Sequence, residues 1–152
     1  MRRATDIRDA YVLMRDVARV ARLFQQENVY CGGVTFLQFT ILDHVNEGSN
    51  GLELAELHDL LAVEKSTTTR LIEPLIEKGF LLKVPSARDA RAIRLGLTAA
   101  GKKAHKEYWE CMAGNLGRAI AQIPAAQYEQ VKEALRLFVR AVGRLSGDRA
   151  CC

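Results

Sequence analysis

The chain has 152 residues, of which 49% are hydrophobic and 26% charged, and its net charge at pH 7 is +4. This size and composition predict one globular domain, without room for a second independent core and without long disordered tracts. Charged side chains interrupt the first 25 residues so often that no apolar run could form a signal peptide or a membrane span. We therefore expect a cytoplasmic protein with no membrane attachment.

Helical spacing of apolar residues dominates the first part of the chain. From Ile7 to Phe24 these residues recur every three or four positions, which predicts one long amphipathic helix. The glycines after Cys31 end this helix. Thr35 and Gln38 then form a capping box, in which each side chain binds the other residue's backbone amide, so a second helix should run to about Asn46.

A short third helix and a fourth helix follow, joined by a tight turn at residues 62–65. Ser66 is expected to be the N-cap of the fourth helix, and Gly79 should end it in the left-handed conformation. Residues 80–84 and 92–97 read as two strands, with residues 85–91 as their connecting loop. Two helices followed by a basic hairpin are the layout of a winged helix-turn-helix, a fold that reads duplex DNA.

The C-terminal part is predicted to be helical again. Thr98 should cap a long helix that ends near Ile123, and Pro124 should open a last helix at its first turn. The central unit cannot cover the apolar stripes of both terminal helices, so self-association as a two-fold dimer is expected. The predicted fold is mainly α with a small β-hairpin wing. It forms a single domain over residues 1–152, with the DNA-binding region at about 35–100 and dimerisation helices at about 5–30 and 101–146.

Positive charge is concentrated on this central unit. Residues 64–103 contain nine Lys or Arg against four Asp or Glu, whereas the rest of the chain has a net charge of −1. Such a concentration suits phosphate neutralisation, although a solvated basic surface would have the same composition.

The fourth helix has two different faces when it is projected at 100° per residue. Thr68, Leu71, Ile72, Leu75 and Ile76 fall on the inner face. The outer face begins with hydroxyl groups and Arg70, which suits contact with phosphates and base edges in a major groove. Pro74 lacks an amide for the Arg70 carbonyl, so a bend is expected there and DNA contacts should stop near Arg70.

Several short motifs follow one another in this region: LAEL at residues 54–57, VEKSTTTRL at 63–71, LIEKGF at 75–80, DAR at 89–91 and LTAAG at 97–101. In this order they resemble the MarR family of bacterial transcription regulators. The resemblance implies a homodimer whose first and last helices interlock, with the fourth helix in the major groove and the wing in the minor groove. It also implies that Arg91 inserts into the minor groove while Asp89 steadies it, which agrees with the negative potential of a narrow groove.

These patterns, together with what the resemblance implies, predict a repressor that binds double-stranded DNA at a pseudo-palindromic operator as a homodimer. The residues expected to contact DNA are Lys65, Ser66, Thr67, Thr69, Arg70, Arg88, Asp89 and Arg91. The alternative is a winged-helix module that binds another protein without sequence-specific DNA binding. Neither a Gly-rich phosphate loop, a nucleophile elbow nor an HExxH motif is present, so we expect no enzymatic activity.

The resemblance further implies release from DNA by a small-molecule effector or by cysteine oxidation. Candidates for lining an effector cleft are Tyr30, His44, Tyr108 and Trp109, with the alternative that His44 simply packs in the core. The four cysteines, Cys31, Cys111, Cys151 and Cys152, are expected to be reduced thiols without metal-ligand spacing, and we expect no metal and no cofactor. They are either a thiol sensor or chemically inert.

Overall fold

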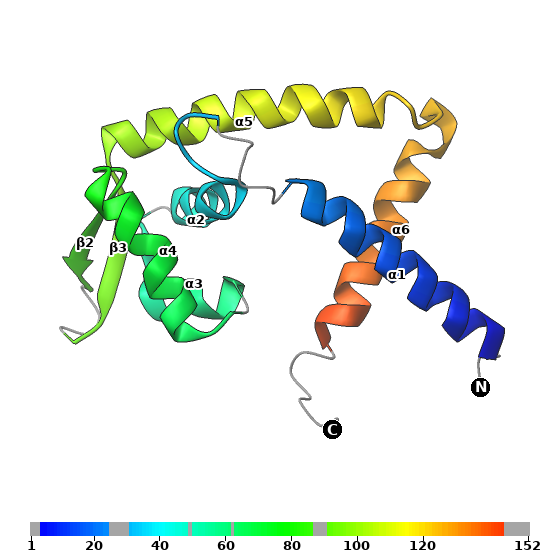
Figure 1. The fold of residues 1–152 in the computed structure, drawn as a ribbon, viewed down its shortest axis with the longest axis horizontal. Coiled ribbons are helices and arrows are strands. Elements are labelled where there is room, and N and C mark those ends of the chain that lie inside the picture. Colours follow the sequence, from blue (N-terminus) through cyan, green and yellow to red (C-terminus); the bar gives the residue numbers. More distant parts are fainter. Residues whose placement is uncertain (1–3, 25–30, 49, 62, 87–90, 145–152) are drawn as a thin grey trace. The chain divides into compact units, whose positions relative to one another are not determined.

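The computed structural model describes residues 4–24, 31–48, 50–61, 63–86 and 91–144. The backbone divides into two compact units, Met1–Cys111 and Met112–Cys152. The architecture is mainly α-helical with one small antiparallel sheet, as the sequence predicts (Figure 1). Within the described ranges, every helix is too short or too polar to cross a membrane.

The first two helices begin where the sequence predicts. Helix α1 (Ala4–Phe24) is amphipathic, and α2 (Phe36–Glu47) starts with a complete capping box. The Gln38 amide donates to Thr35 Oγ1 at 3.2 Å, and the Thr35 amide donates to Gln38 Oε1 at 3.1 Å. Helix α2 lies at the centre of the core, because its apolar face is fully buried. The buried residues of this face are Phe39, Ile41, Leu42 and Val45.

Helices α3 (Leu54–Leu61) and α4 (Lys65–Glu77) form the helix-turn-helix. The prediction that Ser66 is the N-cap of α4 is wrong. Glu64 occupies that position with an extended backbone, and its carbonyl accepts hydrogen bonds from the Thr67 and Thr68 amides at 2.8 and 3.1 Å. The chain therefore becomes helical before Ser66. The predicted inner face of α4 is confirmed: Thr68, Ile72 and Leu75 are buried, and Leu71 and Ile76 are half-buried.

Three strands make the sheet, in the order β1-β3-β2. The wing hairpin consists of β2 (Leu81–Pro85) and β3 (Ile93–Leu97), and Gly79 precedes it with a φ of 71°. Strand β1 (Leu52–Glu53) pairs with the other edge of β3, with Leu52 opposite Leu95. Strand β1 was not predicted, because two residues are too few to show an alternating pattern.

Thr98 joins the wing to the next helix. Helix α5 (Ala99–Ile120) is capped as predicted, since the Gly101 amide donates to Thr98 Oγ1 at 3.0 Å. The Thr98 hydroxyl also donates to the Gly79 carbonyl at 2.6 Å. Gly101 lies so close to the Phe80 carbonyl that a Cβ would collide with it. These contacts fix the first turn of α5 against the start of β2.

The second unit contains the last helix, α6 (Ala125–Gly143). Helix α5 ends at Ile120 rather than near Ile123, and Pro124 is the N-cap of α6 rather than part of its first turn. Within this unit α6 has no fully buried residue. Its large apolar side chains are instead exposed, and they include Leu135, Leu137, Val139 and Val142.

The buried face of α4 yields the first prediction. Leu75 is 0% exposed, so Leu75→Ala should lower the free energy of unfolding by about 2–5 kcal/mol through lost burial and a residual cavity. Chemical denaturation followed by circular dichroism measures this change. Leu82→Ala in β2, where the side chain is 41% exposed, is the matched control and should cost about 1 kcal/mol or less. Equal losses in the two variants would contradict the assigned core.

Candidate nucleic-acid interface

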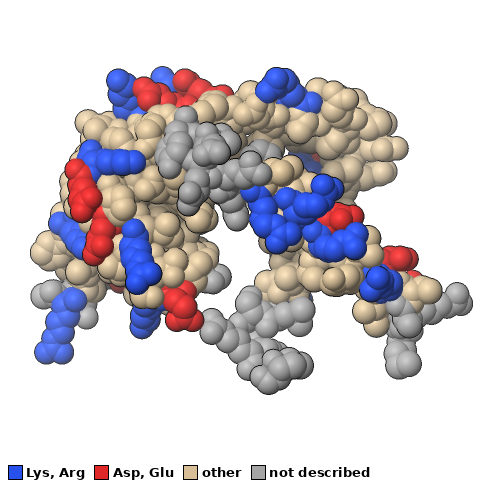
Figure 2. Space-filling view, viewed as in Figure 1, with Lys and Arg blue, Asp and Glu red and all other residues tan. Residues whose placement is uncertain are grey.

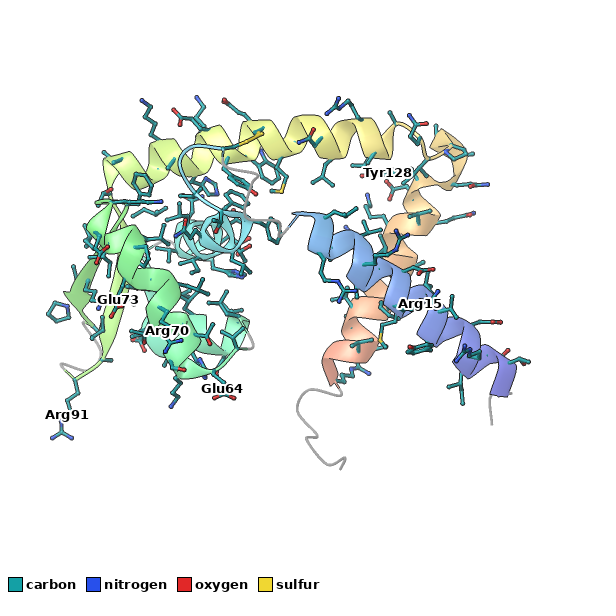
Figure 3. The ribbon with its side chains drawn as sticks, viewed as in Figure 1. Arg15, Glu64, Arg70, Glu73, Arg91 and Tyr128 are labelled. Carbon is teal, nitrogen blue, oxygen red and sulfur yellow. A yellow bond between two sulfur atoms is a disulfide. The ribbon has the colours of Figure 1, made fainter. Side chains whose placement is uncertain are left out.

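The outer face of α4 presents polar and basic side chains to solvent. Five of the residues predicted to contact DNA are exposed there: Lys65, Ser66, Thr67, Thr69 and Arg70. Figure 3 shows the Arg70 side chain projecting from the middle of α4. Thr69 Oγ1 donates to the Lys65 carbonyl at 3.2 Å, which holds one hydroxyl of this face against the helix. The inner face of α4 is buried, and this burial directs the polar and basic side chains of the outer face toward solvent.

The second half of α4 differs in charge from the first. Helix α4 continues through Pro74, which has no amide to donate to the Arg70 carbonyl. Beyond Arg70 the exposed residues Glu73 and Glu77 are acidic. Carboxylates repel phosphate groups, so the chemistry of this face favours polyanion contact at the N-terminal half of α4 alone.

Arg91 lies where the wing loop joins β3. Its side chain is exposed and extends from the end of the hairpin in Figure 3. Two contacts anchor the hairpin behind it: Ser86 Oγ donates to Glu53 Oε1 at 2.7 Å, and Arg94 donates to the Asn50 carbonyl at 3.1 Å. The other predicted wing contacts, Arg88 and Asp89, lie outside the described residues.

A cavity of about 580 Å³ lies between α3, the first turns of α4 and the start of β3. Its lining includes Lys65, Thr69 and Arg91, which the sequence predicts as DNA contacts, and His58 from α3. His58 Nδ1 is 3.2 Å from Thr68 Oγ1, a hydroxyl on the buried side of α4. Candidates from α4 and from the wing thus meet at one concave surface. His58 was not among the predicted contacts, because no motif in the sequence around it pointed to this role.

The predicted effector residues do not share one environment. Tyr108 is buried and stacks on Phe39, with ring centroids 4.5 Å apart, and burial raises the pKa of its hydroxyl. Trp109, the next residue of α5, is 50% exposed. His44 is half-buried, with its ring 3.7 Å from a Glu47 carboxylate oxygen. Tyr30 lies outside the described residues.

His105, and not His44, is the histidine that packs on an aromatic ring of the core. His105 stacks on Phe39 at 5.1 Å between ring centroids, and its Nε2 is 2.7 Å from Asp43 Oδ1. Sequence reasoning missed this pair because the two residues are 62 positions apart and belong to different helices. The pair links α2 to α5 beside the Tyr108 ring.

Two of the four cysteines form a disulfide, which corrects the expectation of four reduced thiols. Cys31 and Cys111 are 80 residues apart in the sequence, with their Cα atoms 6.5 Å apart. Spacing alone could not reveal this pairing, because the fold brings the turn after α1 onto α5. Cys151 and Cys152 lie outside the described residues, and no cluster in the described part of the chain could hold a metal ion.

The turn at residues 31–34 contacts both neighbouring helices. Gly32 and Gly33 have positive φ angles of 63° and 75°. A Cβ on Gly32 would lie 2.6 Å from the Ala104 carbonyl oxygen, so this turn approaches α5 closely. Lys78 Nζ, just after α4, donates to the Gly33 carbonyl at 2.8 Å. One short turn is therefore attached to α5 and to the C-terminal end of α4.

Charged side chains are unevenly distributed over the surface. Figure 2 shows basic groups over the helix-turn-helix with acidic groups among them, and a further basic group over α1. On α5, the basic residues Lys103 and Lys106 lie 3.8 Å from Glu107 and Glu110, respectively. Arg70, in contrast, has no ion-pair partner among the described residues, so its charge is available to a ligand.

Comparisons with known proteins agree with this geometry. Residues 34–101 match the family described as a winged helix DNA-binding domain. The Staphylococcus aureus MepR–DNA complex aligns with a TM-score of 0.72 and 19% identity, over 86% of this chain and 96% of MepR. The chain has the fold of the MarR regulators. The resemblance seen in the sequence is thereby confirmed at the level of the fold.

Two further structures extend this comparison. A MarR transcriptional regulator from Methanosarcina mazei aligns with a TM-score of 0.77 and 20% identity, over 89% of this chain and 99% of that one. The Mycobacterium tuberculosis regulator MOSR in complex with DNA aligns with a TM-score of 0.65 and 22% identity, over 90% and 96% of the two chains. No curated protein sequence is detectably similar to this chain.

The unusual proline of α4 yields the second prediction. Pro74→Ala supplies the missing amide and should raise the free energy of unfolding by about 1 kcal/mol. Proline in a helix interior costs about 3 kcal/mol. Removing this cost outweighs the loss of the ring's packing contacts and the greater conformational entropy of the unfolded chain. Pro124→Ala is the matched control, because an N-cap needs no such amide, and it should change stability little. Urea denaturation measures both variants, and destabilisation by Pro74→Ala would show that the proline ring is required for packing.

Proposed function

We propose that this protein is a transcriptional repressor that binds a pseudo-palindromic operator as a homodimer, without catalytic activity or a bound cofactor. One observation carries the proposal: Lys65 and Thr69, from the exposed face of α4, and the wing residue Arg91 line the same concave surface. The DNA complexes of MepR and MOSR, which share the fold, support the same role here. A cytoplasmic location follows from this role.

Each part of the surface has a distinct task in the proposal. The first turns of α4 enter the major groove, where Arg70 forks onto a guanine and the hydroxyls of Ser66, Thr67 and Thr69 bind phosphates or base edges. Lys65 neutralises a phosphate. Arg91 enters the minor groove next to the wing, with Arg88 and Asp89 beside it in the sequence.

The homodimer is supported by apolar surface on the terminal helices. On α1, Ile7 is 65% exposed and Leu13 is 59% exposed, and on α6 Leu137 and Val139 are 56% and 66% exposed. Helices with such faces are stabilised when a partner covers them. A second copy of the chain is the simplest partner. A two-fold axis would then present two winged helix-turn-helix units to two half-sites about one helical turn of DNA apart.

The test begins with selection of bound duplexes from a random pool, which should enrich a pseudo-palindrome. Arg70→Ala should then weaken binding to that duplex by about tenfold or more, because a bidentate arginine–guanine contact is worth about 1–3 kcal/mol. Fluorescence anisotropy measures the dissociation constants. Arg118→Ala removes an arginine from α5, outside the winged helix-turn-helix, and is the matched control. The repressor proposal fails if no palindrome is enriched, and Arg70 loses its role if operator affinity is unchanged.

Thiol modification is the release mechanism that we propose, because the structure joins Cys31 to Cys111 but gives the predicted effector residues separate surroundings. Cys111 is exposed and Cys31 half-buried, so oxidants can reach the pair. A peroxide would take two electrons and two protons from the two thiols, forming the disulfide and water. The bond links the turn at residues 31–34 to α5, and Lys78 connects this turn to the C-terminal end of α4.

Oxidation with hydrogen peroxide should therefore lower operator affinity by about fivefold or more relative to the protein reduced with dithiothreitol, a typical size for coupling between two sites. Mass spectrometry identifies the Cys31–Cys111 bond, and anisotropy measures the affinity in each state. Cys111→Ser should bind equally under both conditions. A Cys151→Ser and Cys152→Ser double variant is the control and should respond like wild type. Equal affinity of oxidised and reduced wild type would end the thiol proposal without affecting the repressor proposal.

A further inference from the structure

His58 lies at the boundary between the core and the proposed DNA surface. Its ring is half-buried on α3, and Nδ1 is 3.2 Å from Thr68 Oγ1 on α4. Thr68 is only 2% exposed, so its hydroxyl needs a hydrogen-bond partner and the imidazole supplies one. The second ring nitrogen, Nε2, has no hydrogen-bond partner among the described residues. The same ring also lines the cavity that Lys65, Thr69 and Arg91 border.

The hydrogen bond to Thr68 tolerates either charge state of the ring. A threonine hydroxyl can donate to a neutral Nδ1 and can accept from a protonated one, so protonation leaves this contact in place. Nε2 carries its hydrogen in both states, so protonation adds a hydrogen at Nδ1, which faces Thr68, and one positive charge to the ring. The helix-turn-helix geometry can therefore persist while the charge of the cavity changes.

The charged groups around the cavity make this single charge important. Asp59 on α3 and Glu53 on β1 are the acidic residues of the lining, and Glu53 is hydrogen-bonded to Ser86. Lys65 on α4 and Arg91 before β3 are the basic ones. These four formal charges cancel, so the lining is neutral when His58 is neutral and carries +1 when it is protonated. Imidazoles exchange their proton in the physiological pH range.

We propose that His58 is a further DNA-contacting residue: anchored by Thr68, its protonated ring donates through Nε2 to a DNA phosphate at this cavity, so that operator binding takes up protons. The proposal rests on the repressor function, because Lys65, Thr69 and Arg91 bring a phosphate to the cavity only if they contact DNA. Each protonated subunit neutralises one additional phosphate. Binding should therefore become tighter and more salt-dependent as the pH falls.

The experiment measures the dissociation constant of the selected operator duplex over a range of KCl concentrations at about pH 6 and about pH 8. For wild type, the slope of log K against log[KCl] should be steeper at the lower pH by about 0.9 per subunit, the value for one neutralised phosphate. Affinity should rise by roughly fivefold per subunit, because protonation converts a neutral hydrogen bond to the phosphate into a charge-assisted one. His58→Gln should remove both differences.

Three further variants separate contact from a purely structural role. His58→Arg carries a permanent charge and should give the steep slope at both pH values. His44→Gln removes a histidine outside this cavity and should keep the wild-type pH dependence. Thr68→Val removes the anchor and should reduce the difference in slope between the two pH values. Thermal unfolding by circular dichroism verifies that each variant is folded.

The proposal is overturned if the wild-type slope is the same at both pH values, or if His58→Gln keeps the wild-type difference. It is also overturned if His58→Arg fails to restore the steep slope while remaining folded. These results differ from a failure of the repressor function, in which no operator would be enriched at either pH. Specific, Arg70-dependent binding without proton uptake would refute only the role of His58.

Discussion

Burial of one face of α4 is the constraint on which the proposed DNA surface depends. Ile72 and Leu75 are at most 2% exposed, so the helix cannot rotate about its axis without exposing apolar surface to water. Because the helical period is fixed, anchoring these residues also fixes the direction of Arg70 on the opposite side. Thr98 and Gly101 hold the following wing and α5 in place. The packing of the core thus determines which side chains face a ligand.

Features that depend on residues close in sequence could be predicted. The capping box of Thr35 and Gln38 and the left-handed Gly79 are local, and the structure confirms them. The faces of α4 followed from periodicity alone. Ser66 was misplaced although it is also local, because serine at any early helical position can resemble an N-cap. The deciding property was the extended backbone of Glu64, which no residue preference reveals.

Features that depend on distant pairing could not be predicted. Asp43 and His105 lie 62 positions apart, and Cys31 and Cys111 lie 80 apart. Strand β1 forms through the pairing of Leu52 with Leu95, a residue far away in the sequence. His58 was overlooked for the same reason. Its role depends on the hydrogen bond to Thr68 on the next helix and on the cavity that it lines together with Arg91, and the residues next to His58 in the sequence predict neither.

The turn at residues 31–34 explains how chemistry at a cysteine could reach α4. Its glycines allow a close approach to Ala104 that any side chain on Gly32 would prevent, so the turn packs directly on α5. The Gly33 carbonyl in turn accepts from Lys78, immediately after α4. Of these attachments, only the Cys31–Cys111 bond changes covalently with redox conditions. Its formation would restrict a turn that α4 and α5 share, whereas a proton on His58 would act on the opposite end of α4. The two signals would therefore reach the same helix through independent contacts.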